Sequence, residues 1–221
     1  TQNQAFSALL FLFVRVLDRD VTFDAVRAKM PERIPVVLSQ DEVFDLLSQI
    51  PQGPNRLMAG IMYGSGLRVM ECCRLRIKDV DFKRLQISVR EGKGEKDRMV
   101  PLPKRLVPYL FEQVDFVTRQ HQQDLEVGAG WVWMPYAYDQ KDKQAARSLN
   151  WQYLFPAKNL SRDKRPREND GTLVDQSDQL RRHHVHANGI QRIVKRAANA
   201  CGINKKVTCH TLRHTFATHL L

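Results

Sequence analysis

The spacing of the apolar residues changes from a helical period to a strand period and back, which limits this chain to a mixed fold. Apolar and polar residues alternate over 85–89, and a second apolar segment over 100–102 follows the loop 91–97. This pattern predicts a β-hairpin with Lys93 near its tip. Helical spacing covers residues 5–17, 39–50, 56–63, 67–75, 104–123, 190–201 and 208–221. We therefore predict a mainly α-helical chain with one small antiparallel sheet, an α+β fold.

Two prolines mark a domain boundary early in the chain. Pro31 and Pro35 bias the residues before them toward extended structure, so we expect one domain in 1–30 and another in 31–221. In the first, the nearly unbroken apolar run 5–17 predicts a helix that is buried on most sides. We expect a piece of a longer protein, because the sequence starts without a methionine and stops inside an apolar helical pattern.

The net charge points to an anionic partner. Lys and Arg number 35 against 24 Asp and Glu, a formal charge of +11, and such a surplus draws a protein to nucleic acid or to an anionic membrane surface. No apolar run approaches the roughly 20 residues of a membrane-spanning helix, and no secretory signal is recognisable. We expect no membrane partner and a cytoplasmic location. The four cysteines are too few for a disulfide framework and are expected to be reduced packing residues.

Three segments carry cations in positions that suit a phosphate. Arg68 follows a Gly-Ser-Gly turn at the start of a helix, where free backbone N–H groups favour an anion. His210 and Arg213 are three residues apart and share one helix face. Lys93 stands between two glycines on the hairpin. Each has a simpler interpretation: Arg68 pairs with Glu71 on the surface, the His210 face is solvated, and Gly-Lys-Gly is only a good turn.

A zinc site is a further alternative. Thr211 stands where an H-E-x-x-H metalloprotease needs its glutamate, and no paired cysteine spacing supports a structural site. We therefore predict no metal. The ligands of such a site would come from His183, His184, His186, Cys209, His210 and His214.

Aromatic residues gather between 131 and 155, and all three tryptophans lie there. Exposed rings stack on nucleic-acid bases, whereas buried rings pack against helices, and both interpretations are open. A mostly polar segment over 158–182 follows. The next helix has an apolar stripe that leaves Arg192, Lys195 and Arg196 on another face, where they can contact DNA phosphates.

Taken together, the ordered motifs resemble those of the tyrosine recombinases. The motifs are Gly66-Leu67-Arg68 with Glu71, the Lys93 hairpin, and the run H-T-L-R-H-T-F-A-T-H-L-L at 210–221. The aromatic tract with Arg182-His183-His184 further resembles the integron integrases, which carry an inserted segment there. The resemblance implies that 1–30 is the last part of a helical, SAM-like core-binding domain. It also implies that 31–221 is an incomplete catalytic domain of the recombinase fold with an insert at about 125–187.

The resemblance implies a role for each matching residue. Arg68 and Arg213 are expected to clamp the scissile phosphate. His210 is expected to hydrogen-bond to it, and Lys93 to protonate the departing 5′ oxygen. Fixed cationic donors of this kind stabilise phosphoryl transfer without a metal, and the family uses no cofactor. The implied function is DNA integration and excision of gene cassettes through a 3′-phosphotyrosine.

One element of the family pattern has no match. The nucleophilic tyrosine of the family lies beyond the second arginine, and only eight residues follow Arg213. All tyrosines of this chain precede that arginine: Tyr63, Tyr109, Tyr136, Tyr138 and Tyr153. We therefore expect these 221 residues to bind DNA without cleaving it. A non-catalytic DNA-binding module, in which the same residues only hold phosphates, is the alternative.

In integron integrases the insert recognises bases that protrude from a folded single-stranded site. Stacking on aromatic or imidazole rings suits such bases, because every base offers a π-face. The candidates here are Trp131, Trp133, Tyr136, His183 and His184. The family assembles as a homo-tetramer on DNA, and we expect a monomer for this chain without DNA. In a bacterial cell we expect it at the nucleoid.

Overall fold

The structure is a computed structural model that describes residues 2–19, 34–90, 97–134, 142, 144–162 and 180–220. The chain separates into two compact units, Thr1–Ile34 and Pro35–Leu221. In the first unit, helix α1 (Gln2–Phe11) continues into a π-helical turn, η1 (Leu12–Val16), and neither element has a buried residue. The predicted helix is present, but the prediction that it is buried on most sides is not met in the described residues, where none of its side chains is buried.

The second unit is mainly helical with two small antiparallel sheets, which confirms the predicted fold class. Its α-helices are α2 (Gln40–Gln49), α3 (Pro54–Ser65), α4 (Val69–Cys73), α5 (Val107–Glu126), α7 (Ala187–Ala200) and α8 (Cys209–His219). Short 3₁₀ turns are η2 (Ile77–Asp79), η3 (Lys104–Leu106), η4 (Ala145–Arg147) and η5 (Leu149–Trp151). The strands are β1 (Val80–Asp81), β2 (Gln86–Val89), β3 (Arg98–Pro101), β4 (Ser161–Arg162) and β5 (Leu180–Arg181). None of the helices in the described residues is long and apolar enough to cross a membrane.

Local capping fixes where α2 begins. The Glu42 backbone N–H donates to Ser39 Oγ at 3.1 Å, and the Ser39 N–H donates to Glu42 Oε2 at 2.7 Å. These two bonds satisfy backbone donors that a helix start leaves without partners. Ser39 and Glu42 therefore form the capping box that their spacing indicates.

The three-stranded sheet has the order β1-β2-β3 with antiparallel neighbours. Ile87 pairs with Val100, and Val89 pairs with Arg98. The observed strand starts one residue later than the predicted one, because Leu85 has a φ of 54° and closes the turn after β1. Asp81 Oδ1 accepts hydrogen bonds from the backbone of the two residues that follow Phe82, which stabilises that turn.

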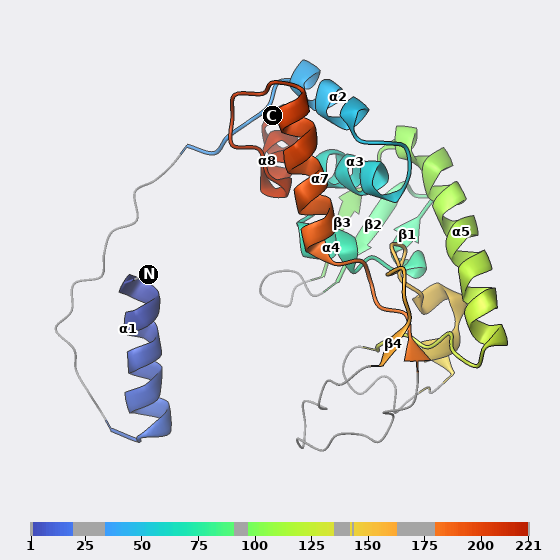
Figure 1. Ribbon diagram of the computed structural model, residues 1–221, viewed down its shortest axis with the longest axis horizontal. Helices are drawn as coiled ribbons and strands as arrows, with labels where there is room; N and C mark the ends of the chain where they lie inside the picture. Colours follow the sequence, from blue (N-terminus) through green and yellow to red (C-terminus); the bar gives the residue numbers. More distant parts are fainter. Residues whose placement is uncertain are drawn as a thin grey trace. The chain divides into compact units, whose positions relative to one another are not determined.

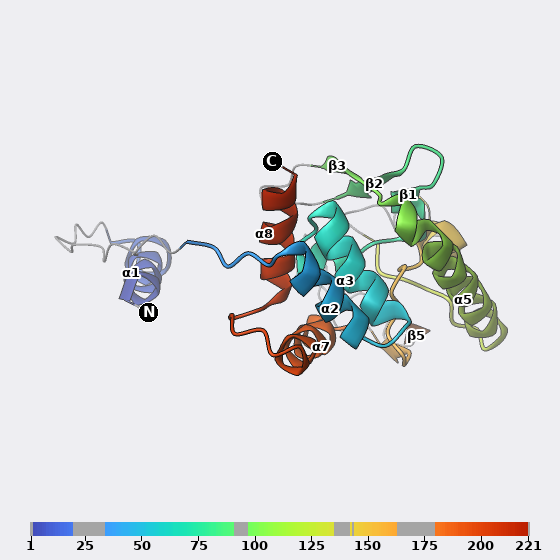
Figure 2. The same ribbon diagram turned by 90° about the horizontal axis from the view of Figure 1, so that it is seen from above.

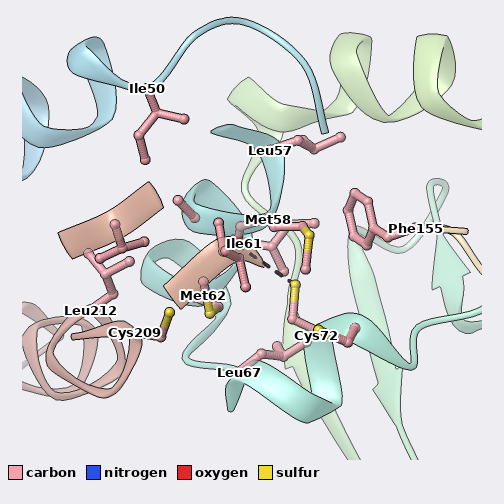
Figure 3. Close-up of a cluster of buried hydrophobic side chains, with 14 of the residues drawn as sticks. Ile50, Leu57, Met58, Ile61, Met62, Leu67, Cys72, Phe155, Cys209 and Leu212 are labelled. Atoms are coloured by element: carbon pink, nitrogen blue, oxygen red, sulfur yellow. Dashed lines mark hydrogen bonds between the residues drawn. The ribbon is translucent and has the colours of Figure 1, made fainter. Parts of the chain in front are cut away.

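A single hydrophobic core joins the helices to the sheet. Helix α3 lies between α8 and α5 in both views of the ribbon (Figures 1 and 2). Its side chains Met58, Ile61 and Met62 are fully buried in the cluster that Figure 3 shows, which also includes Leu67 and Leu212. All four cysteines are free, and three of them are buried. The helices and strands that carry the candidate site residues thus pack around one shared core.

The aromatic tract has a smaller core of its own, formed by Val132, Met134, Ala145, Ala146 and Tyr153. Hydrogen bonds fasten this tract to α5. Gln113 Nε2 donates to the Leu154 carbonyl at 2.8 Å, and the Arg182 guanidinium binds both carboxylate oxygens of Asp124 at 2.6 Å. Arg182 also donates to the carbonyls of Ala157 and Lys158. One buried ion pair therefore holds the segment that leads to His183 and His184.

We expect Asp124→Asn to lower the free energy of unfolding by about 3 kcal/mol, because it leaves the buried Arg182 guanidinium without its counter-charge. Urea unfolding at neutral pH measures the change. Glu126→Gln on the exposed end of the same helix is the matched control and should change stability by less than about 0.5 kcal/mol. Equal effects of the two substitutions contradict the role of the ion pair.

Candidate phosphate-binding site

Arg68 begins α4 and is tied to the carboxylate of Glu71 one helical turn later. The Arg68 backbone N–H donates to Glu71 Oε2 at 2.8 Å, and the guanidinium Nη1 donates to Oε1 at 2.8 Å. The side chain of Arg68 stays 36% exposed, whereas that of Glu71 is 8% exposed. The expected surface pairing is thus present, and the guanidinium still reaches solvent.

Two further arginines from distant segments converge on the same carboxylate. Arg98, the first residue of β3, donates from Nη1 to Glu71 Oε1 at 3.0 Å and from Nη2 to Oε2 at 2.6 Å. Arg213 Nη1 on α8 lies 3.8 Å from Oε2. The cluster of Arg68, Arg98 and Arg213 around Glu71, called the arginine cluster below, holds three cations and one carboxylate.

The turn between α3 and α4 supplies a further hydrogen-bond partner for Arg213. The Arg213 Nη1 donates a short hydrogen bond to the Gly66 carbonyl. Gly66 has a φ of 63°, and a Cβ at this position would collide with the Phe216 ring on α8. Only glycine therefore allows both the left-handed turn and the close approach of α8 that brings Arg213 to Glu71.

His210 extends the cluster on the exposed face of α8. Its ring meets the ring of His214 edge to face, with centroids 4.5 Å apart. Burial lowers the pKa of His210, and the charges of His214, Arg213 and Arg68 lower it further. The imidazole is therefore mainly neutral at pH 7, with an N–H free to donate. The structure brings together Arg68, His210 and Arg213, as the spacing and the resemblance indicate.

The electrostatics of the arginine cluster favour an incoming anion. Burial raises the pKa of Glu71, but hydrogen bonds from Arg98 and Arg68 outweigh it and lower that pKa to about 2. The carboxylate is thus ionised at neutral pH and neutralises one of three guanidinium charges. Burial and the nearby Arg68 also lower the pKa of Arg213. Bidentate donors with surplus positive charge suit a phosphate dianion or diester.

Lys93 lies outside the described residues, as do Tyr136 and Tyr138. The strands on both sides of its loop are described, and β3 begins with Arg98 at the arginine cluster. The base of the hairpin is therefore anchored at the cluster.

The basic residues of α7 lie on its exposed face. Arg192, Lys195 and Arg196 are all exposed, and Arg192 Nε donates to the Asn188 carbonyl at 3.3 Å. No finding tests whether they contact phosphates, so this stays a prediction.

The candidate zinc ligands do not gather into a metal site in the described ranges. There, His, Cys, Asp and Glu side chains form no group of three that could hold a metal ion.

The site residues lie in a segment that matches a known protein family. Positions 36–221 match the model of the phage integrase family. The chain belongs to the phage integrase family. Its second unit is a tyrosine recombinase catalytic domain in fold. An integrase/recombinase of Escherichia coli is 40% identical over 223 aligned residues, which cover 100% of this chain and 63% of that protein.

Two other comparisons show more distant similarity to this chain. Tyrosine recombinase XerA of Pyrococcus furiosus is 31% identical over 195 aligned residues, covering 87% of this chain and half of the relative. A crystal structure of XerA recombinase superposes with a TM-score of 0.53 at 27% identity, covering 100% of this chain and 62% of that one. The chain thus spans less than two thirds of the length of each of these relatives.

Four of the five predicted base-contacting residues lie in the described part of the chain, and these four are half-buried: Trp131, Trp133, His183 and His184. The Trp131 carbonyl accepts from the Arg182 N–H, and Arg147 lies over the Trp131 ring at 5.2 Å. The Trp133 carbonyl accepts from Arg76. The His183 carbonyl accepts from Ala157 N–H, and the His184 ring meets Tyr153 edge to face at 5.3 Å.

The sequence analysis missed Arg98 and Arg76 as organising residues. Arg98 reads as one exposed residue of a short strand, and only the fold brings it to Glu71. Arg76 is buried and donates to the carbonyls of Trp151 and Trp133, with Tyr153 under its guanidinium. The signal was an arginine followed three residues later by Asp79, whose carboxylate caps the next turn.

We expect Glu71→Gln to lower the free energy of unfolding at pH 7 by about 2 kcal/mol, less than for a fully buried pair because the arginines are partly exposed. The pKa of Glu71 falls from an ordinary 4.5 to about 2 on folding. Its stabilisation is therefore fully present above about pH 4.5 and is lost as pH falls toward 2.

Urea unfolding of both proteins at neutral pH and near pH 3 measures this dependence. The difference between them should shrink at the lower pH. Glu112→Gln, an exposed position on α5, is the control and should show no such difference. The assignment is contradicted if the difference in free energy of unfolding between Glu71→Gln and the unchanged protein does not change with pH.

Proposed function

We propose that this chain is the catalytic domain of a site-specific DNA recombinase, with the arginine cluster as the site of the scissile phosphate. One observation carries the proposal: Arg68 and Arg213, from opposite ends of the domain, meet at a single buried carboxylate beside His210. Family membership and the recombinase relatives support the same function. A site with fixed donors suits phosphoryl transfer, in which charge spreads over the nonbridging oxygens.

Each residue of the site has a chemical task in this proposal. The guanidinium groups of Arg68 and Arg213 bind the nonbridging oxygens, and neutral His210 donates a hydrogen bond to the same phosphate. Lys93 protonates the departing 5′ oxygen. No metal ion and no other cofactor enters the proposed reaction.

The proposed nucleophile is a tyrosine that these 221 residues do not supply. Among the described tyrosines, Tyr63 OH bonds to His219 Nδ1 at 3.0 Å, and Tyr153 packs against Arg76 and His184. Tyr109 is exposed on α5. None of these three described rings contacts Arg68, His210 or Arg213, which supports DNA binding without cleavage.

On a nicked recombination-site substrate, we expect this 221-residue chain to form no covalent adduct that survives denaturing electrophoresis. A longer relative with its tyrosine is the positive control. In that relative, replacing the arginine equivalent to Arg213 by alanine should abolish the adduct and weaken binding only modestly, because the charge stabilises the transition state. An adduct on the 221-residue chain overturns the proposed inactivity. A pure DNA-binding module would give none with either protein.

We further propose that the recombinase is of the integron type and acts on folded single-stranded sites of gene cassettes. Residues 1–30 then belong to a core-binding domain, and the insert occupies about 125–187. Trp131, Trp133, His183 and His184 stack on protruding bases, while the α7 cations hold backbone phosphates. The buried Asp124–Arg182 pair supports this role, because it gives the His183–His184 segment a fixed position. The chain is proposed to be monomeric without DNA, tetrameric on DNA in the longer protein, and located in the cytoplasm at the nucleoid.

We expect this chain to prefer a DNA hairpin with two protruding bases over the same hairpin without them by about tenfold or more, since one stacked base contributes about 1 to 3 kcal/mol. Competition fluorescence anisotropy at fixed salt measures the preference. His183→Ala should reduce it, whereas His186→Asn, which removes a nearby imidazole but keeps a helix-capping side chain, should not. Equal binding of the two hairpins contradicts the integron assignment and leaves the recombinase function intact.

A further inference from the structure

Lys78 is a half-buried cation with an unusual setting. It belongs to η2, and its ammonium lies directly over the indole ring of Trp151 in η5. Within the described part of the chain, it forms neither a hydrogen bond nor an ion pair with a carboxylate. An indole face attracts an ammonium but leaves its net charge in place.

The neighbours of Lys78 are mostly cations. Asp79 is the one acidic neighbour among the described residues, and its carboxylate already accepts from Arg90 Nε at 3.0 Å and from the Arg76 backbone N–H at 3.0 Å. The Arg76 guanidinium is buried under carbonyl groups, while the Arg90 side chain is 51% exposed. Lys78 and Arg90 thus share one described carboxylate, which is already hydrogen-bonded.

Among the described residues, this arrangement leaves the ammonium of Lys78 without a carboxylate partner of its own. Burial and the charge of Arg90 lower the pKa of Lys78 to about 8. A bound anion would offset both effects, because it supplies the missing counter-charge next to the ammonium. The open sides of the ammonium and of the Arg90 guanidinium are the available donors.

We propose that Lys78 and Arg90 bind a backbone phosphate of the DNA, with Trp151 as the floor under the ammonium. The inference rests on the proposed DNA recombinase function and adds a phosphate contact outside the arginine cluster. The position supports it, because Arg90 is the last described residue before the hairpin loop that carries Lys93. Val89, the residue before Arg90, pairs with Arg98 of the arginine cluster, so a DNA strand bound at the cluster would pass close to Arg90.

The first test uses the salt dependence of DNA binding by the whole chain. Lys78→Met removes the charge but keeps an unbranched side chain on the Trp151 ring. We expect the slope of log affinity against log salt to become shallower by about 0.9, the value for one lost phosphate contact. Affinity should then fall roughly eightfold near 0.1 M salt. Lys83→Met, in the exposed turn after β1, removes the same charge as a matched control and should have a clearly smaller effect.

The second test uses pH and does not depend on the fold of Lys78→Met. A phosphate favours the charged ammonium, so affinity of the unchanged chain should fall as pH rises through about 8. Lys78→Arg stays charged and should retain the affinity while losing most of that pH dependence. Thermal unfolding of each variant confirms that it is folded.

The outcomes separate this site from the function on which it rests. A normal salt slope for the unchanged chain, with the same slope in Lys78→Met and the same pH profile in Lys78→Arg, overturns the Lys78 site alone. Absence of salt-dependent DNA binding by the unchanged chain overturns both proposals.

Discussion

The ionised carboxylate of Glu71 is the interaction on which the catalytic domain depends. Three arginines that belong to α4, β3 and α8 would repel one another without it, and the segments that carry them are far apart in the sequence. Hydrophobic packing brings these elements near each other, but it does not set the orientation of guanidinium groups. The carboxylate does, because each charge-assisted hydrogen bond has a narrow range of favourable geometry. It neutralises only part of the charge, so the same group that assembles the site leaves it attractive to phosphate.

The turn at the end of α3 helps to hold Arg213 in this arrangement. Its Gly66 supplies the carbonyl that accepts from Arg213, and it leaves room for the ring of Phe216. Beyond that contact, the buried Thr215 hydroxyl accepts from the Leu38 backbone N–H at 3.1 Å, which ties the segment before α2 to α8. Helix α8, which carries His210 and Arg213, is thus hydrogen-bonded both to the turn after α3 and to the segment before α2.

The sequence predicts what local chemistry controls and misses what depends on distant partners. The helix periods and the hairpin were predicted from local patterns and are confirmed by the structure, and the Ser39–Glu42 cap is local as well. The strand start at Leu85 was wrong because turn geometry after Asp81 outweighs the alternation of apolar residues. Arg68, His210 and Arg213 were found through motifs, whereas Arg98 and Arg76 act through contacts that no local spacing encodes.

The aromatic tract is both a structural element and a candidate base-binding surface, and the contacts of Arg76 explain how it can be both. Arg76 donates to the main-chain carbonyls of Trp133 and Trp151. These bonds fix the backbone that carries the two indole rings. Trp151 is further covered by Lys78, which makes it a support and not a stacking partner. Rings held in this way lose little freedom when a base stacks on them, and that saving in entropy favours binding. In the proposed function, the polar scaffold beneath the tract would therefore hold Trp131 and the His183–His184 segment ready for a stacked base.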